Sequence, residues 1–202
     1  MNNKERLLEK LKDQGFSKGI VSVFRKVDRK LFVGESYLDE SYLDIALPIG
    51  NSQTISQPYT IAFMFSLLKL EKGLKVLEVG SGSGYVLALL SKFCSSGQVF
   101  GIELIEDLAK KSILRLRNYK NVKVIIGDGK KGLIKEALFD RILVSAAGKK
   151  VPGELLKQLK VGGILVMPIS STSTENSIRV VEKGKNKNKV MDISGFVFVP
   201  LK

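Results

Sequence analysis

The chain has 202 residues, of which 44% are hydrophobic and 26% charged, as expected for one globular domain with a sizeable core. Its formal net charge is +13, and it contains no histidine and a single cysteine, Cys94. A Ser-His-Asp or Cys-His nucleophilic site is excluded, because the imidazole base is missing. A zinc site built from Cys and His is excluded too, as is an internal disulfide. We therefore expect no metal centre and a reducing, cytoplasmic environment.

The sequence shows neither a targeting signal nor a membrane span. The N-terminal segment MNNKERLLEKLKDQG is charged and lacks the apolar core of a signal peptide. The most apolar stretch, residues 60–70, is shorter than the roughly 18 to 20 residues that a transmembrane helix needs. The 33 basic residues comprise 26 Lys and 7 Arg, spread along the chain, whereas nucleic-acid recognition favours Arg. We expect a lysine-rich solvated surface, with no nucleic-acid or membrane partner, on a monomer.

The first third of the chain is predicted to be helical at both ends and irregular between them. Residues 4–33 form two amphipathic helices separated by Gly15 and Gly19, which act as breaks. Residues 34–57 are irregular, with loop signals at Pro48, Gly50 and Asn51. Ser56-Gln57-Pro58 then opens an apolar helix that runs to about Lys69, with Ser56 as its N-cap.

From Lys75 onward, strands alternate with helices, which predicts a parallel sheet covered on both faces. The fold class is α/β: a Rossmann-like, doubly wound, mostly parallel sheet with an antiparallel C-terminal strand pair and an N-terminal helical extension. Residues 1–202 form a single domain, with helices and a substrate-side loop in 1–58 and the Rossmann-like core in 59–202. The expected strands are 76–79, 98–104, 122–126, 139–146, 163–168, 177–182 and 190–199, and the expected helices are 85–93, 106–118 and 153–159.

A glycine-rich loop, Glu78-Val-Gly80-Ser-Gly82-Ser-Gly84, joins the first strand of this core to its helix. Glycines permit a tight turn and a close approach of the backbone to a ligand, and the helix N-terminus offers free N–H groups. The dinucleotide fingerprint is G-x-G-x-x-G, whereas here the third glycine comes one residue early. A turn that binds no ligand remains the alternative.

Two carboxylates at the ends of the following strands favour a nucleoside cofactor. Glu103 lies 19 positions after Gly84, where a carboxylate can accept hydrogen bonds from both ribose hydroxyls. Asp128, in Gly127-Asp128-Gly129, can contact an exocyclic amine, although an ordinary turn residue is the alternative. Because the carboxyl ends of parallel strands share one edge, these residues are predicted to face the same crevice.

The motifs VLEVGSGSGY, GIEL and IGDG resemble the S-adenosyl-L-methionine (SAM) motifs of class I methyltransferases. Three further segments are specifically similar to protein-L-isoaspartate O-methyltransferases: YLDIALPIGNSQTISQPYTIAFM, FDRILVSAAGKKVPGELLKQLKVGGILVMPI and the closing FVFVPL. The resemblance extends from about Phe32 to Leu201, and the block Gln53–Pro58 is more specific than the glycine loop.

The resemblance implies a protein-L-isoaspartate(D-aspartate) O-methyltransferase, which transfers a methyl group from SAM to the free carboxylate of an isoaspartyl residue in an aged protein. The labile ester collapses to a succinimide, which gives a route back to normal aspartate. By the same resemblance Ser56 is the active-site serine, Glu103 binds the ribose and Asp128 lies near the adenine. The predicted site comprises catalytic Ser56; cofactor-binding Glu78, Gly80, Ser81, Gly82, Ser83, Gly84, Glu103, Asp128 and Gly129; and substrate-binding Gln53, Thr54, Ile55 and Gln57, without a metal.

This reaction suits a chain without histidine. A carboxylate acceptor with a pKa of about 4 is already ionised at pH 7, so no general base is needed. Rate enhancement must come from holding the reacting atoms in line and from desolvation. We expect the N-terminus of the helix that opens at Ser56 to cradle the substrate carboxylate, with help from the Ser56 hydroxyl. A plain N-cap is the alternative role for Ser56.

Several positions depart from the family pattern. Asn51-Ser52 stands where a glycine normally precedes the Gln-Thr-Ile-Ser block, and Lys130-Lys131 follows GDG where many relatives have an aromatic residue. Leu104 replaces a common Arg after the ribose-binding Glu, and Val197 stands where many bacterial relatives have Arg. These departures bear on substrate preference and efficiency rather than on the class of reaction.

Two other functions remain open from the sequence. A SAM-dependent RNA methyltransferase is motivated by the +13 charge and predicts RNA binding that falls steeply with salt. A SAM-binding module that has lost turnover predicts cofactor binding without methyl transfer. An NAD dehydrogenase ranks below both, because the glycine spacing is wrong.

Overall fold

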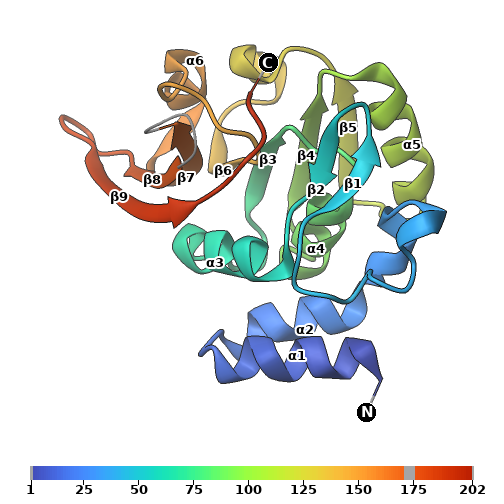
Figure 1. Ribbon diagram of the computed structural model, residues 1–202. Helices are drawn as coiled ribbons and strands as arrows, with labels where there is room; N and C mark the ends of the chain where they lie inside the picture. Colours follow the sequence, from blue (N-terminus) through green and yellow to red (C-terminus); the bar gives the residue numbers. More distant parts are fainter. Residues whose placement is uncertain (1, 171–175, 202) are drawn as a thin grey trace.

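The computed structural model describes residues 2–170 and 176–201, and within them it contains a seven-stranded sheet, a separate two-stranded hairpin and six α-helices (Figure 1). The strands are β1 (Leu47–Gly50), β2 (Gln53–Ile55), β3 (Lys75–Val79), β4 (Gln98–Glu103), β5 (Val122–Ile126), β6 (Phe139–Val144), β7 (Leu159–Ser170), β8 (Asn176–Glu182) and β9 (Lys189–Phe196). The helices are α1 (Asn3–Asp13), α2 (Lys18–Lys26), α3 (Pro58–Leu68), α4 (Tyr85–Phe93), α5 (Glu106–Leu116) and α6 (Gly153–Lys157).

The main sheet has the strand order β5-β4-β3-β6-β7-β8-β9. Neighbouring strands are parallel from β5 to β7, whereas β7 pairs with β8, and β8 with β9, in antiparallel register. This arrangement confirms the predicted mostly parallel sheet with an antiparallel C-terminal pair. The chain steps outward from β3 to β5 and then returns to place β6 on the other side of β3. Such a reversal opens a crevice at the carboxyl ends of the strands, where ligands bind.

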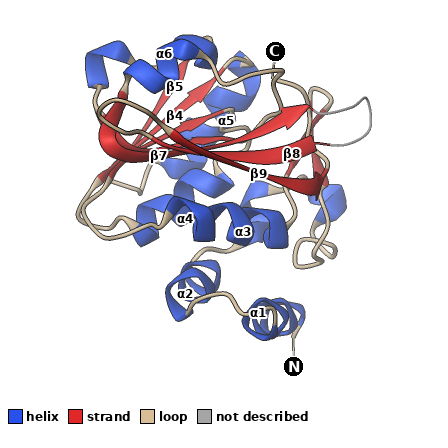
Figure 2. Cartoon of the chain, turned by 90° about the vertical axis from the view of Figure 1, so that its left-hand side faces the viewer, coloured by secondary structure: helices blue, strands red, loops and turns tan. Residues whose placement is uncertain are grey.

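Each face of the sheet supports its own apolar core, because successive side chains of a strand point to opposite faces. In β3, Val76 belongs to the larger core with α1 to α4, and Leu77 belongs to the second core, where Leu155 of α6 is buried. Figure 2 shows α3 and α4 on one side of the sheet and α6 on the other. This double cover explains why the central strands read as continuous apolar runs.

The two predicted N-terminal helices are present as α1 and α2, and they form an extra layer beneath α3 and α4 (Figures 1 and 2). Ser17 caps α2, its Oγ accepting a hydrogen bond from the Ile20 amide at 3.3 Å. Gly15 makes the break between the helices with φ at +85°. The predicted break at Gly19 is wrong, because Gly19 lies inside α2. After α2, a 3₁₀ turn, η1 (Arg29–Phe32), leads the chain toward the sheet.

The prediction of an irregular segment over 34–57 is wrong for residues 47–55, which form a hairpin. Strands β1 and β2 pair in antiparallel register, and Asn51 and Ser52 form the two-residue turn between them. Both turn residues have positive φ, 54° and 56°, as a type I′ turn requires. The sequence pattern concealed this hairpin because its strands are short and Pro48, which is a loop signal in the sequence, lies inside the first of them.

The predicted start of α3 is also wrong. The helix begins at Pro58 with Gln57 at the N-cap, and Ser56 lies one position before the cap. The Tyr59 amide of the first turn donates to Asp44 Oδ1 at 2.8 Å, and Asp44 Oδ2 pairs with Lys10 Nζ at 2.9 Å. A carboxylate of the chain itself therefore occupies the position that we expected the substrate carboxylate to take. The Tyr59 amide is thus not free to bind the substrate carboxylate.

No helix within residues 2–170 and 176–201 is both long and apolar enough to cross a membrane.

Candidate active site

A pocket opens where the parallel strands end, between the main sheet, the β1–β2 hairpin and the C-terminal segment. It lies at the reversal of strand order, as the topology predicts. Its lining residues come from parts of the chain that are far apart in sequence: Ile49, Gln53–Ser56, Glu78–Ser83, Tyr85, Val86, Ile102–Ile105, Gly129, Ser145, Ala146 and Val199–Leu201.

The glycine loop forms the floor of this pocket. Gly80, Gly82 and Gly84 all have positive φ, which a side chain would strain. Gly80 and Gly82 line the pocket, whereas Gly84 faces α5. A Cβ on Gly84 would lie 2.7 Å from Ser112 Oγ and 2.9 Å from Leu116 Cδ1. The glycines therefore serve two purposes. Gly84 allows the start of α4 to pack closely against α5, and Gly80 and Gly82 leave room for a ligand in the pocket.

Glu103, at the end of β4, is held rigidly against this loop. Its Oε2 accepts a hydrogen bond from the Gly82 amide at 2.7 Å, and its Oε1 accepts one from the Ile105 amide at 2.8 Å. The side chain is buried yet lines the pocket. Each carboxylate oxygen can accept more than one hydrogen bond, so both retain capacity for ligand hydroxyls. This geometry suits the predicted ribose contact.

Glu78, at the end of β3, lies deeper in the same wall and is 1% exposed. Its Oε1 accepts a hydrogen bond from Ser145 Oγ at 2.7 Å, whereas its Oε2 is buried without a partner among the described residues. Burial raises the pKa of Glu78 to about 8, the Ser145 hydrogen bond opposes that rise and the nearby Glu103 charge adds to it. An unpartnered buried carboxylate oxygen at a pocket wall is a site for a cation or a donor group.

The charges of the pocket discriminate between cofactor classes. Glu78 and Glu103 are its acidic lining residues, and neither Lys nor Arg is found among the described residues that line it. A pyrophosphate would meet two acidic side chains and no basic one, whereas a cofactor with a sulfonium and an ammonium group would be attracted and would favour the ionised form of Glu78. The residues present therefore fit SAM and do not fit a dinucleotide.

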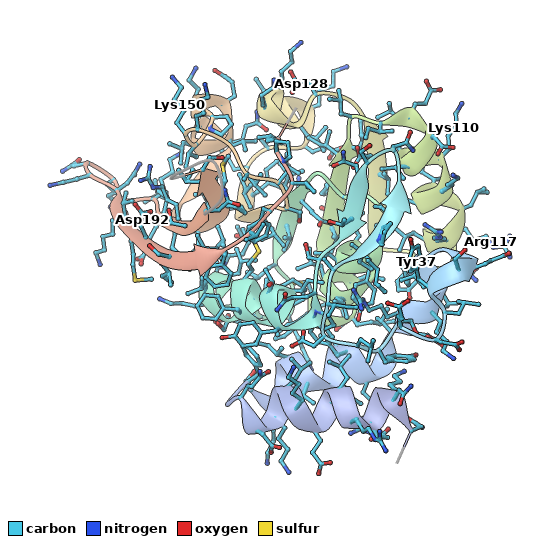
Figure 3. All side chains as sticks on the ribbon, viewed as in Figure 1. Tyr37, Lys110, Arg117, Asp128, Lys150 and Asp192 are labelled. Atoms are coloured by element: carbon cyan, nitrogen blue, oxygen red, sulfur yellow. The ribbon has the colours of Figure 1, made fainter. Side chains whose placement is uncertain are left out.

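Asp128 and Gly129 follow β5 at the edge where the parallel strands end, and Figure 3 labels Asp128 there. Gly129 lines the pocket, but Asp128 is not among the lining residues. Asp128 Oδ1 accepts a hydrogen bond from the Lys130 amide at 3.0 Å and caps the short 3₁₀ turn η3 (Gly129–Lys131). The turn role considered as the alternative is thus present, and the adenine contact of Asp128 stays a prediction.

The β1–β2 hairpin supplies the opposite wall. Gln53, Thr54, Ile55 and Ser56 all line the pocket, whereas Gln57, at the N-cap of α3, does not. Ser56 is half-buried, and its hydroxyl makes no hydrogen bond to any residue in the described ranges. Ser56 therefore lines the pocket with a hydroxyl that is available to a ligand.

Sequence reasoning missed a third wall, formed by Val199, Pro200 and Leu201. The loop after β6 fixes this segment, because the Ala147 amide donates to the Val199 carbonyl at 2.8 Å and the Leu201 amide donates to the Ala147 carbonyl at 2.7 Å. The closing FVFVPL carried part of the family resemblance and was the available signal, but no residue in it has a reactive group. Ser145, the partner of Glu78, lies in the family-like segment that begins at Phe139, but no local pattern marks its hydroxyl as a partner for a carboxylate 67 positions away.

The fold and the site together define a class I, SAM-dependent methyltransferase. The family model "Protein-L-isoaspartate(D-aspartate) O-methyltransferase (PCMT)" matches residues 2–202. The chain belongs to this family. A protein-L-isoaspartate O-methyltransferase of Archaeoglobus fulgidus is 44% identical to it over 98% of this chain and 92% of the relative. One from Dictyoglomus thermophilum is 41% identical, covering all of this chain and 91% of the relative.

Solved structures agree with this family. One protein-L-isoaspartate O-methyltransferase superposes with a TM-score of 0.90 at 28% identity, covering 98% of this chain, which spans 65% of that longer chain. A protein described as a possible family member from Plasmodium falciparum, solved with S-adenosyl-L-homocysteine, gives a TM-score of 0.87 at 27% identity. That comparison covers 100% of this chain and 99% of the other.

Proposed function

We propose that this chain transfers a methyl group from SAM to the free carboxylate of L-isoaspartyl residues in damaged proteins. The observation that carries this proposal is a single pocket with two dissimilar walls. One wall presents Glu78 and Glu103, and the other presents the family-specific segment Gln53–Ser56. A cationic methyl donor fits the first wall, and its transferable group is then close to residues that the family resemblance assigns to the substrate.

SAM supplies a methyl group that its sulfonium charge already activates. We assign the ribose hydroxyls to Glu103, whose orientation is fixed by the amides of Gly82 and Ile105. We assign a positively charged group of the cofactor to Glu78, whose Oε2 has no internal partner among the described residues. Asp128 and Gly129 then border the adenine side, as the motif IGDG implies.

The acceptor needs no base from the protein. An isoaspartyl carboxylate is ionised at pH 7, so the reaction joins its oxygen to the methyl carbon as the bond from that carbon to sulfur breaks. We assign to Ser56 a hydrogen bond to the acceptor carboxylate, which holds the attacking oxygen in line. Opposite charges neutralise each other in this step, so a partly closed pocket favours the transition state.

We further propose that the protein acts in the cytoplasm as a monomer and without nucleic acid. A buried single cysteine, Cys94, and the absence of histidine suit a reducing compartment and a reaction without metal. Lysines are distributed along the chain rather than gathered with arginines, which supports a solvated surface.

Two experiments separate this function from the two alternatives. Calorimetric titration with SAM should show binding at one site, and labelled methyl should then appear on an isoaspartyl peptide. Binding without transfer to the peptide would instead support a module that has lost turnover. Transfer to RNA, with affinity that falls steeply as salt rises, would support the RNA methyltransferase.

A further inference from the structure

Arg29, in the 3₁₀ turn η1, is fully buried and binds four backbone carbonyls. Its Nη1 donates to the carbonyls of Ser41 at 2.9 Å and Leu43 at 3.2 Å. Its Nη2 donates to those of Ile45 and Ser56, each at 3.0 Å. No carboxylate in the described ranges pairs with it. Burying an unpaired cation is costly, so its persistence here calls for a specific use of these hydrogen bonds.

The four carbonyls lie on both sides of the β1–β2 hairpin. Ile45 comes two residues before β1, and Ser56 directly follows β2, so Nη2 joins the two ends of the hairpin. The hairpin forms its own two-stranded sheet and has no ladder hydrogen bonds to the seven-stranded sheet. Its position over the pocket must therefore come from other contacts. At the exposed tip, one hydrogen bond joins Asn51 Nδ2 to Asp107 Oδ2 at 3.2 Å.

The same guanidinium also contacts the cofactor wall. It lies over the ring of Tyr85, with 5.9 Å between the guanidinium carbon and the ring centroid. Tyr85 is the first residue of α4, directly after the glycine loop, and it lines the pocket. A cation over an aromatic face is attracted to it, more strongly where both are desolvated. One buried side chain thus touches the wall with the glycine loop and the wall with Ser56.

We propose that Arg29 is a positioning residue for methyl transfer, which fixes the base of the β1–β2 hairpin so that Ser56 faces the cofactor wall at a constant distance. This inference rests on the proposed function of Ser56. Arginine suits the task because its planar fork presents five N–H donors in fixed directions, whereas lysine offers a single flexible ammonium. Displacement of a reacting group by about 1 Å can cost about 100-fold in rate, which is why such a clamp matters for catalysis.

Hydrogen exchange tests the clamp independently of any turnover. In Arg29→Met and the milder Arg29→Lys, we expect faster exchange of the amides in residues 47–56, with α4 and β3 unchanged. Arg141→Met is the matched control, because Arg141 also donates to backbone carbonyls alone. Its Nε donates to Leu68 at 2.6 Å and its Nη2 to Lys69 at 3.2 Å, both at the C-terminal end of α3, and its Nη1 donates to Asp140 at 2.8 Å. Exchange of residues 47–56 at the wild-type rate in both Arg29 variants would overturn the clamp.

Kinetic measurements test whether the Arg29 clamp serves methyl transfer. Below the melting temperature, we expect Arg29→Lys to lower kcat on an isoaspartyl peptide by about 10- to 100-fold, while the affinity for SAM changes by less than about threefold. Arg141→Met should leave kcat within about twofold of the wild type. A loss of kcat that only follows the folded fraction, or an equal loss of SAM affinity, would contradict the positioning role.

A double-mutant cycle with Ser56→Ala links the two residues. If Arg29 acts through Ser56, the loss of rate in the double variant is smaller than the product of the two single losses. The reason is that Ser56→Ala removes a hydroxyl that the Arg29 substitution has already displaced. Losses that multiply fully would show that Arg29 does not act through Ser56. If Ser56→Ala alone turns over like the wild type, the proposed role of Ser56 fails, and the hydrogen-exchange result still decides whether Arg29 holds the hairpin.

Discussion

At the scale of single residues, the pocket contains polar atoms that the protein leaves free and polar atoms that it fixes. Glu103 has both oxygens bound to backbone amides, whereas Glu78 Oε2 and the Ser56 hydroxyl have no partner among the described residues. A fixed group can orient a ligand without losing conformational entropy of its own when the ligand binds. Polar groups without an internal partner form their hydrogen bonds only when a ligand binds. Substitution of such a residue should therefore change ligand binding or turnover more than it changes the free energy of unfolding.

Ser56→Ala should lower kcat on an isoaspartyl peptide by about 10- to 100-fold, the rate equivalent of one hydrogen bond to a charged group. Its free energy of unfolding should change by less than about 1 kcal/mol, because the hydroxyl has no described internal partner to lose. Initial-rate kinetics and denaturant titration measure the two quantities. Unchanged turnover would remove Ser56 from the mechanism.

We expect Glu78 to make SAM binding depend on pH. Because burial raises its pKa to about 8, the carboxyl is mostly protonated at pH 7 before a cationic ligand binds, and the ligand favours the ionised form. We expect the affinity for SAM to rise from about pH 6 to about pH 7, because binding then releases a proton from Glu78. This range lies below the pH at which the amino group of SAM itself titrates. Titration calorimetry in two buffers of different ionisation enthalpy measures that proton. Glu78→Gln should bind more weakly and without the pH dependence, and an identical pH slope in this variant would exclude Glu78.

The same substitution should stabilise the fold. A raised pKa in the folded state means that the stability contributed by protonated Glu78 is complete below about pH 4.5 and is lost as the pH rises toward 8. Glu78→Gln keeps an acceptor for Ser145 and cannot ionise, so its melting temperature should exceed that of the wild type increasingly from pH 5 to pH 8, by about 2 to 4 °C per kcal/mol. A lower melting temperature at pH 8 would show that the ionised carboxylate stabilises the protein.

Residues with distinctive chemistry were predictable from sequence, and residues that act through the backbone were not. Glu103 and Ser56 both line the pocket, and they were candidates from the sequence because a carboxylate at a strand end and a serine in a specific block match known patterns. Arg29 binds carbonyls 12 to 27 positions away, and Asp44 binds the amide of a residue 15 positions away. No local pattern marks such partners, because any residue can supply a carbonyl or an amide.

At the scale of elements, the parallel strands and their helices followed from apolar periodicity, and the hairpin did not. A strand of three or four residues is too short for a period-two pattern to be distinguished from a loop. The start of α3 failed for a tertiary reason, since Asp44 rather than the expected Ser56 binds the first-turn amide. The family glycine replaced by Asn51-Ser52 is also explained, because both residues occupy the left-handed region that glycine favours.

Gly84→Ala tests how the glycine loop joins its helix to α5. The added methyl would lie within 3 Å of Ser112 Oγ and Leu116 Cδ1, at a backbone φ of +85°. We expect a loss of about 2 to 4 kcal/mol in the free energy of unfolding, together with weaker SAM binding. Gly153→Ala is the control, since a methyl group there would meet nothing within 4 Å and the backbone φ is ordinary. Equal stability of both variants in denaturant titration would contradict this packing.

At the scale of the whole molecule, three separate segments meet at one edge of the sheet: the strand ends, a hairpin clamped by the N-terminal region and the C-terminal segment Val199–Leu201. The sequence predicted the sheet and its cover of helices on both faces, but contacts between these distant segments depend on tertiary packing. The absence of histidine is consistent with this assembly, because an ionised acceptor and an activated donor require positioning rather than a base.

The most direct test of the central claim compares two peptides that are identical except for one residue, L-isoaspartate or L-aspartate, in a labelled-methyl transfer assay with SAM. The proposed function predicts that the purified chain methylates the isoaspartyl peptide at a carboxylate, as a base-labile ester, and leaves the aspartyl peptide essentially unlabelled. Equal labelling of both peptides, or labelling of neither by a chain that binds SAM, would contradict it.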